Sequence, residues 1–107
     1  MSYKIKNYNK DSIYLSITNL IQSLVFQRIG EERLRQDKNW GIQNHSNEIW
    51  LSILIEELGE VIKNSNELRE SKITKYHYWY KNQIKKELIQ VAAVAVAWLE
   101  DLERSKK

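Results

Sequence analysis

Apolar residues recur at helical spacing in three long stretches of the chain. The first repeat, between Ile13 and Ile29, predicts a helix capped by Asp11 or Ser12 and ending near Asp37. Similar repeats predict a second helix over about residues 47–67 and a third over about 80–103. The absence of proline favours long helices with few breaks. The pattern therefore predicts an all-α protein built as a helical bundle.

The segments outside these helices differ in character. Residues 37–46 are rich in Asn and Gly and predict a turn. Residues 66–82 have a weak hydrophobic pattern and an aromatic run, and they predict a connector with at most a short helical turn. Residues 1–10 are polar and are expected to be flexible. The length of 107 residues is expected to form a single domain, covering residues 1–107.

Carboxylates interrupt the apolar stripe of the second predicted helix. On a helical wheel, Glu57 falls in the middle of the stripe, Glu60 falls at its edge, and Glu56 is farther round. The stripe consists of Trp50, Ile53, Leu54 and Val61. A buried carboxylate is costly unless it is paired, protonated or bound to a cation. The placement therefore predicts a site rather than a solvated surface.

The third predicted helix repeats this anomaly. Glu87 falls between Val94 and Trp98 on the wheel, and Gln90 follows one turn later on the side of Val94. Four alanines between positions 92 and 97 would let another helix approach closely. Because this helix is apolar nearly all round, we expect it to be central in the fold or in an oligomer.

Inward-facing carboxylates on two helices can converge on a divalent cation. Oxygen ligands without cysteine suit Mg²⁺, or Mn²⁺, better than zinc. Mg²⁺ held by carboxylates commonly also binds a substrate phosphate. The residues alone leave an alternative open, in which Glu57, Glu60 and Glu87 form salt bridges between helices.

The composition of the chain excludes several classes of site and of partner. The chain has no cysteine, which excludes disulfides and cysteine-ligated zinc, and its three glycines are too scattered for a phosphate-binding loop. The longest apolar run, 91–99, is too short to span a bilayer, and the first ten residues lack the apolar run of a secretory signal. We therefore expect a cytoplasmic protein without a membrane partner. The net charge of +3 is mild and spread along the chain, so nucleic acid is not an expected partner.

With these features the chain resembles the MazG-like all-α nucleoside triphosphate pyrophosphohydrolases. Their metal signature is E-x-x-E followed, after a variable gap, by E-x-x-D. The sequence "ELGE" at 57–60 matches the first half, and "ELIQ" at 87–90 stands in the place of the second half. The block "RQDKNWGIQNH" at 35–45 and the helix "ELIQVAAVAVAWLE" at 87–100 are also similar to a branch of this family. The resemblance covers about residues 28–63 and 84–101.

The resemblance implies hydrolysis of a nucleoside triphosphate between its α and β phosphates, giving a monophosphate and pyrophosphate. It implies Mg²⁺ held by Glu57, Glu60, Glu87 and Gln90, with Glu56 or Glu57 positioning or deprotonating the attacking water. The substrate-binding residues expected from it are Lys38, Trp40, Asn44, His45, Lys85 and Lys86. Among them, Trp40 would stack on the base, Asn44 would hydrogen-bond to it, and the lysines at 85 and 86 would meet the phosphates. A homodimer or homotetramer is also implied, in which oligomerisation completes the bundle.

Gln90 departs from the family pattern, because an acid is expected at this position. A neutral amide gives the site one charge less and weaker Mg²⁺ binding. The family match therefore leaves two alternatives beside the enzyme. One is a nucleotide-binding protein that has lost turnover, and the other is a helical assembly module built on the alanine-rich helix and the aromatic segment.

Overall fold

The computed structural model describes residues 8–105, with side chains from residue 12 onward, and these residues form three α-helices. They are α1 (Tyr8–Trp40), α2 (Asn47–Glu70) and α3 (Thr74–Arg104). The expectation of an all-α fold is confirmed. None of the helices in the described part is long and apolar enough to cross a membrane.

Two predicted boundaries are wrong. The aromatic run at 76–80 belongs to α3, so the expected connector over 66–82 shrinks to the three residues 71–73. Helix α1 begins at Tyr8, which places Asp11 and Ser12 inside the helix rather than at its cap. Of the segment expected to be flexible, residues 8–10 are helical and 1–7 lie outside the described residues.

Local interactions define the ends of α2. The Ser46 hydroxyl accepts a hydrogen bond from the Ile49 backbone N–H and caps the first turn. At the other end, the His77 ring nitrogen lies 2.9 Å from the Ser71 carbonyl oxygen and ties the turn to α3.

Gly41, at the end of α1, has a φ of +71°, a left-handed conformation that glycine adopts without strain.

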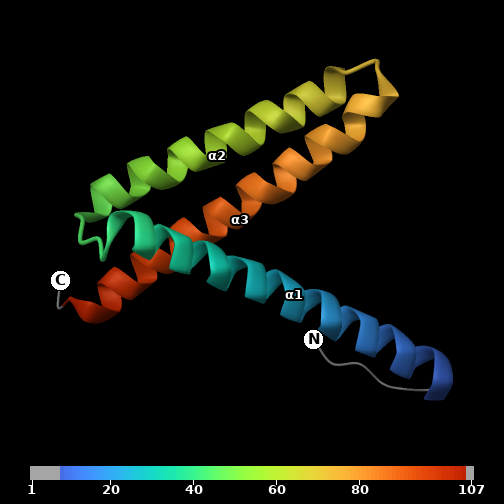
Figure 1. The fold of residues 1–107 in the computed structure, drawn as a ribbon, viewed down its shortest axis with the longest axis horizontal. Helices are drawn as coiled ribbons and strands as arrows, with labels where there is room; N and C mark the ends of the chain where they lie inside the picture. The colour runs from blue at the N-terminus through green and yellow to red at the C-terminus, as the bar shows by residue number, and fades with distance from the viewer. Residues whose placement is uncertain (1–7, 106–107) are drawn as a thin grey trace.

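Helix α3 is the element on which the other two pack. Figure 1 shows α2 and α3 lying antiparallel along their length, with α1 crossing near the C-terminal half of α3. Over the described residues, α1 and α2 make no comparable backbone contact with each other. The expectation that the last helix is central is confirmed.

The hydrophobic core lies between α2 and α3 and is small. Trp50, Val94 and Ala97 are buried together, and three half-buried residues, Ile53, Leu54 and Trp98, pack against them. Ala93 is also fully buried, as a small side chain at a close helix approach allows. This core is formed by the stripes that the sequence predicted for the second and third helices.

The apolar stripe of α1 is exposed. Its N-terminal half extends away from α2 and α3 (Figure 1). Six large apolar side chains of the stripe are between 38% and 60% exposed: Ile13, Ile17, Leu20, Ile21, Leu24 and Val25. The radius of gyration is 17.9 Å, whereas a compact chain of this length has about 13 Å. The single chain therefore leaves an apolar surface that a compact domain of this size would bury.

Candidate functional site

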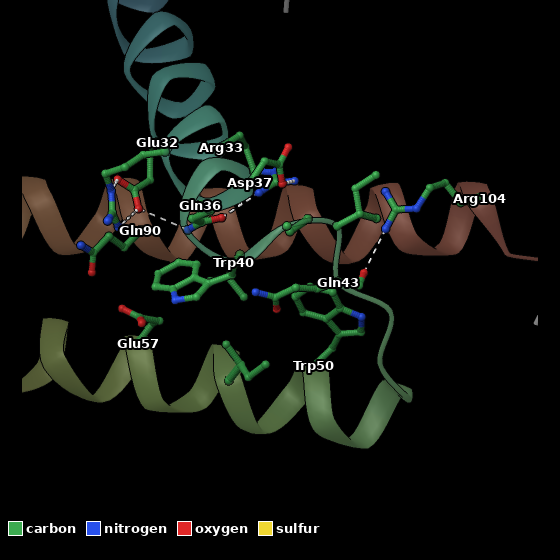
Figure 2. Close-up of a pocket in the computed structure, with 16 residues that line it drawn as sticks. Glu32, Arg33, Gln36, Asp37, Trp40, Gln43, Trp50, Glu57, Gln90 and Arg104 are labelled. Atoms are coloured by element: carbon green, nitrogen blue, oxygen red, sulfur yellow. Dashed lines mark hydrogen bonds and ion pairs between the residues drawn. The ribbon is translucent and has the colours of Figure 1, made fainter.

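A cavity of about 480 Å³ opens between the C-terminal part of α1 and the facing sides of α2 and α3. Figure 2 shows α1 above this space, α2 below it and α3 behind it. The lining side chains are mostly polar on α1 and mixed on α2 and α3. They come from Glu32, Arg33, Arg35, Gln36, Asp37, Trp40, Gly41, Ile42, Gln43, Trp50, Ile53, Glu57, Gln90, Val94, Ala97 and Arg104.

Arg33 fixes the crossing of α1 and α3. Its guanidinium donates to both carboxylate oxygens of Glu100, at 3.0 and 2.7 Å. It also donates to Gln36 and Asp37 within α1, each at 2.9 Å. The hydrogen bond to Arg33 lowers the pKa of Glu100 and keeps that carboxylate charged. A bidentate pair of this kind sets the angle at which α1 forms the upper wall of the cavity.

Asp101 anchors the loop between α1 and α2. Its carboxyl group is buried, with a residue exposure of 1%, and Oδ2 accepts hydrogen bonds from Trp50 Nε1 at 2.6 Å and from the His45 backbone N–H at 3.0 Å. The Arg104 guanidinium donates to the Gln43 carbonyl at 3.0 Å. These contacts hold the loop against the end of α3, so the loop forms a fixed side wall of the cavity.

The acidic end of the cavity is lined by Glu57 from α2 and Gln90 from α3, and Glu87, which does not line the cavity, lies beside Gln90. With its amide nitrogen directed toward the two carboxylates, Gln90 donates to Glu57 Oε2 at 3.0 Å and to Glu87 Oε2 at 3.1 Å. Figure 2 shows the Glu57 carboxylate directed into the cavity. The structure thus brings together three of the four residues predicted to bind metal.

Burial raises the pKa of Glu57, and the negative charges of Glu87, Glu56, Glu60 and Glu32 raise it further, in that order. A carboxylate in this environment is easier to protonate than an exposed one. It also gains more than an exposed one from a cation placed beside it, since the cation offsets the same repulsion. The electrostatics of Glu57 therefore favour cation binding at this end.

The α1 wall of the cavity, which faces α2, carries the Arg35–Glu32 ion pair and the Trp40 indole. Arg35 donates to both carboxylate oxygens of Glu32, at 2.8 and 2.6 Å, and its guanidinium lies 5.5 Å from the centre of the Trp40 ring. The bond to Arg35 lowers the pKa of Glu32. Trp40 lines the cavity and remains 59% exposed, so much of its side-chain surface is accessible to a ligand. Figure 2 shows Trp40 between Gln36 on α1 and Glu57 on α2.

The other predicted site residues lie farther out. Glu56 and Glu60 are exposed and do not line the cavity, although their charges raise the pKa of Glu57. Lys38, Asn44 and Lys85 are also exposed and outside the lining.

Two further residues predicted to bind substrate, His45 and Lys86, do not line the cavity and make other contacts. His45 is half-buried, its backbone bonds to Asp101, and its ring nitrogen lies 2.9 Å from Gln43 Oε1, so it positions the loop. Lys86 lines a second, shallower groove between α1 and α3, together with Arg28, Glu32, Arg35, Ile89 and Gln90.

The donor set at the acidic end suits Mg²⁺ or Mn²⁺, because it consists of carboxylate and amide oxygens on two facing helices. Within the described residues, no three His, Asp or Glu side chains are already close enough to form a complete metal site. Glu57, Glu87 and Gln90 provide the part of the site that the fold brings together, and the metal remains a prediction.

Three residues on α1 and α3 that shape the cavity were not predicted from the sequence. Arg33 and Gln36 follow Ile29 at helical spacing, so they continue the apolar stripe of α1 with polar side chains. Asp101 similarly continues the buried stripe of α3 after Val94 and Ala97. The signal that identified Glu57, a polar residue in an apolar stripe, was therefore also present at these positions.

Comparison with protein-family models, with curated proteins and with solved structures found no match to this chain.

Proposed function

We propose that the protein is a Mg²⁺-dependent nucleoside triphosphate pyrophosphohydrolase. The observation that carries the proposal is the polarity of one cavity, which combines a carboxylate from α2, Glu57, with a largely exposed indole from α1, Trp40. A nucleotide has the matching polarity, because its base stacks on aromatic rings and its phosphates bind cations. The volume of about 480 Å³ lies in the range of small-molecule sites.

In this proposal the chain orients the substrate from both sides. Trp40 stacks on the base through its accessible surface, and the phosphates extend toward Glu57 and Glu87. Glu56 and Glu60 add negative charge near this end, and Glu57, which lines the cavity, positions the water. When bound, Mg²⁺ would supply neutralisation of the phosphate oxygens and a site for the attacking water. The water attacks the α-phosphorus, the bond to the bridging oxygen breaks, and the products are a nucleoside monophosphate and pyrophosphate.

We also propose that the active form is a homodimer or homotetramer in which the α1 stripe is covered by another copy. The support is the exposure of six large apolar side chains on one helix of a chain with a small core. Isolated monomers rarely leave an apolar surface of this extent in water. A second copy is a suitable partner, because burying the same stripe twice removes it from solvent in both chains.

The direct test is pyrophosphate release from a panel of ribo- and deoxyribonucleoside triphosphates, with and without Mg²⁺. Glu57→Gln is expected to abolish release while the far-UV circular dichroism spectrum is preserved. The matched control is Glu48→Gln, the same change at an exposed residue in the first turn of α2. Full activity of Glu57→Gln, or equal losses in both variants, would overturn the site assignment.

The neutral Gln90 favours one alternative, a protein that binds nucleotide without turnover. Mg²⁺-dependent nucleotide binding without pyrophosphate release would support that alternative over the enzyme. Absence of both, with a folded protein, would support an assembly module based on the exposed helix surfaces.

A further inference from the structure

Gln90 occupies the point where α2 and α3 bring two carboxylates together. Its terminal amide lies 3.0 Å from Glu57 Oε2 and 3.1 Å from Glu87 Oε2. Glu87 and Gln90 are one turn apart on α3, and Glu57 reaches them from α2. The amide is therefore the group through which the two facing acids are connected.

The amide can fill this position in two orientations that have nearly the same shape. With the nitrogen inward, it donates one hydrogen bond to each carboxylate and compensates their repulsion. With the carbonyl oxygen inward, three oxygens would face one another at these distances, which is unfavourable without a cation or a proton among them. Adjacent oxygens around a Mg²⁺ ion, each about 2.1 Å from the metal, are separated by about 3.0 Å.

We propose that Gln90 is a clamp whose amide nitrogen competes with the divalent cation for the two carboxylates. In the metal-free protein, the amide nitrogen holds Glu57 and Glu87 together. When the cation binds, the amide rotates by half a turn about its last side-chain bond and its oxygen becomes a ligand. This inference rests on the proposed function, because it assumes that Glu57 and Glu87 bind the cation.

Two consequences distinguish the clamp from a simple neutral ligand. The metal-free protein keeps its acids together without a cation, so the junction of α2 and α3 is stable in the absence of metal. Cation binding is weaker than with a carboxylate at position 90, since two hydrogen bonds must first be broken and one charge is missing. Gln90→Glu keeps the shape of the side chain. It should therefore destabilise the metal-free junction of α2 and α3 and also strengthen cation binding.

The experiment measures Mn²⁺ binding by electron paramagnetic resonance, and thermal unfolding with and without Mn²⁺. It compares the wild type with Gln90→Glu, Glu57→Gln and a control, Gln83→Glu. Gln83 lies two turns earlier on the same side of α3 and does not line the cavity. The control adds the same charge one turn before Glu87, so it accounts for the repulsion from an added charge and leaves the two hydrogen bonds of Gln90 in place.

Gln90→Glu is expected to lower the Kd for Mn²⁺ by at least about tenfold relative to Gln83→Glu. Its Tm without metal should be lower than that of the control, and Mn²⁺ should raise it more. If Mn²⁺ binds to the wild type, is lost in Glu57→Gln and is not tightened in Gln90→Glu, the clamp is wrong while the proposed function survives. If Mn²⁺ binds to none of the proteins, or equally to wild type and Glu57→Gln, then the clamp and the proposed function are both wrong.

A second measurement uses the wild type alone and applies even if Gln90→Glu fails to fold. The side-chain NH₂ signal of Gln90 is followed by nuclear magnetic resonance during titration with Mg²⁺. We expect slow hydrogen exchange of this group without metal and loss of that protection at saturation. A signal whose protection is unchanged, while the backbone signals of Glu57 and Glu87 shift, would overturn the clamp. If no signal shifts, the cation-dependent function fails as well.

Discussion

The hydrogen bond between Trp50 and Asp101 is expected to be a major stabilising contact, and it can be tested by replacing Trp50 with Phe. The indole is 2% exposed, and its Nε1–H donates to a carboxyl oxygen of Asp101 at 2.6 Å. Phenylalanine removes the donor and leaves part of the indole volume empty. Trp98 offers a matched control, since its Nε1–H donates to Asn47 Oδ1 at 3.1 Å in an exposed pair.

The expected loss in the free energy of unfolding follows from the burial of the Trp50 side chain. Weakening the hydrogen bonding of a buried polar group costs about 1–3 kcal/mol, and the lost volume adds about 1 kcal/mol, so Trp50→Phe should cost about 2–4 kcal/mol. An exposed hydrogen bond between neutral groups contributes about 0.5–1 kcal/mol, and the half-buried Trp98 loses less packing than Trp50, so Trp98→Phe should cost about 1–1.5 kcal/mol. The two variants should therefore differ by about 2 kcal/mol in the free energy of unfolding.

The assay is urea unfolding followed by far-UV circular dichroism, at one protomer concentration because association stabilises the folded chain. For a slope of about 1.5 kcal/mol per molar urea, the midpoint of Trp50→Phe should lie about 1.3 M below that of Trp98→Phe. Equal losses in the two variants, within about 0.5 kcal/mol, would refute the argument that burial makes the Asp101 bond the stronger one.

Three further predictions concern the phosphates, the helix crossing and association. Lys86→Ala should raise KM for the triphosphate about tenfold, whereas Lys85→Ala should not, since only Lys86 lines the groove beside Gln90; equal KM values in steady-state assays would contradict this. Glu100 has a lowered pKa because of Arg33, so its contribution to stability is full above its ordinary pKa of 4.5 and is lost as pH falls through the lowered value. Below about pH 4.5 the unfolding free energy of wild type should therefore fall more steeply than that of Glu100→Gln, and parallel pH profiles would exclude the pair as the cause. Leu20→Glu should shift the protein to monomers in sedimentation velocity, and an unchanged mass would exclude the α1 stripe as the interface.

Much of the fold could be predicted because two of the stripes also form the core. Trp50 and Val94 lie on the faces that the periodicity marked, and both are buried. The start of α3 was missed because its half-buried positions at helical spacing include His77 and Tyr80, whose polar groups obscure the apolar pattern. For α1 the periodicity correctly marked an apolar face, but a pattern in one chain does not specify what covers that face.

The candidate site could be predicted only in part. Glu57, Glu87 and Gln90 were found because their placement in apolar stripes can be seen within single helices. Glu32 and Arg35 contribute through a crossing between α1 and α3, and the geometry of a crossing depends on contacts between residues distant in sequence, such as Arg33 with Glu100. The resemblance implied a substrate role for His45, and no pattern in the sequence indicated its backbone bond to Asp101, because that contact joins residues 56 positions apart.

The order of the helices along the chain has a consequence for biosynthesis. Helix α1 packs only on α3 among the described helices, and α3 is the last of the three to be translated. During translation α1 therefore emerges from the ribosome well before the helix on which it packs, and its apolar stripe, which α3 leaves exposed, is in contact with water or with a chaperone from the start. The pairing of α2 with α3 joins neighbours in sequence and can form quickly once α3 is complete. Among the described helices, docking of α1 on α3 closes a longer loop than the pairing of α2 with α3, so this step is the more exposed to misassembly between nascent chains.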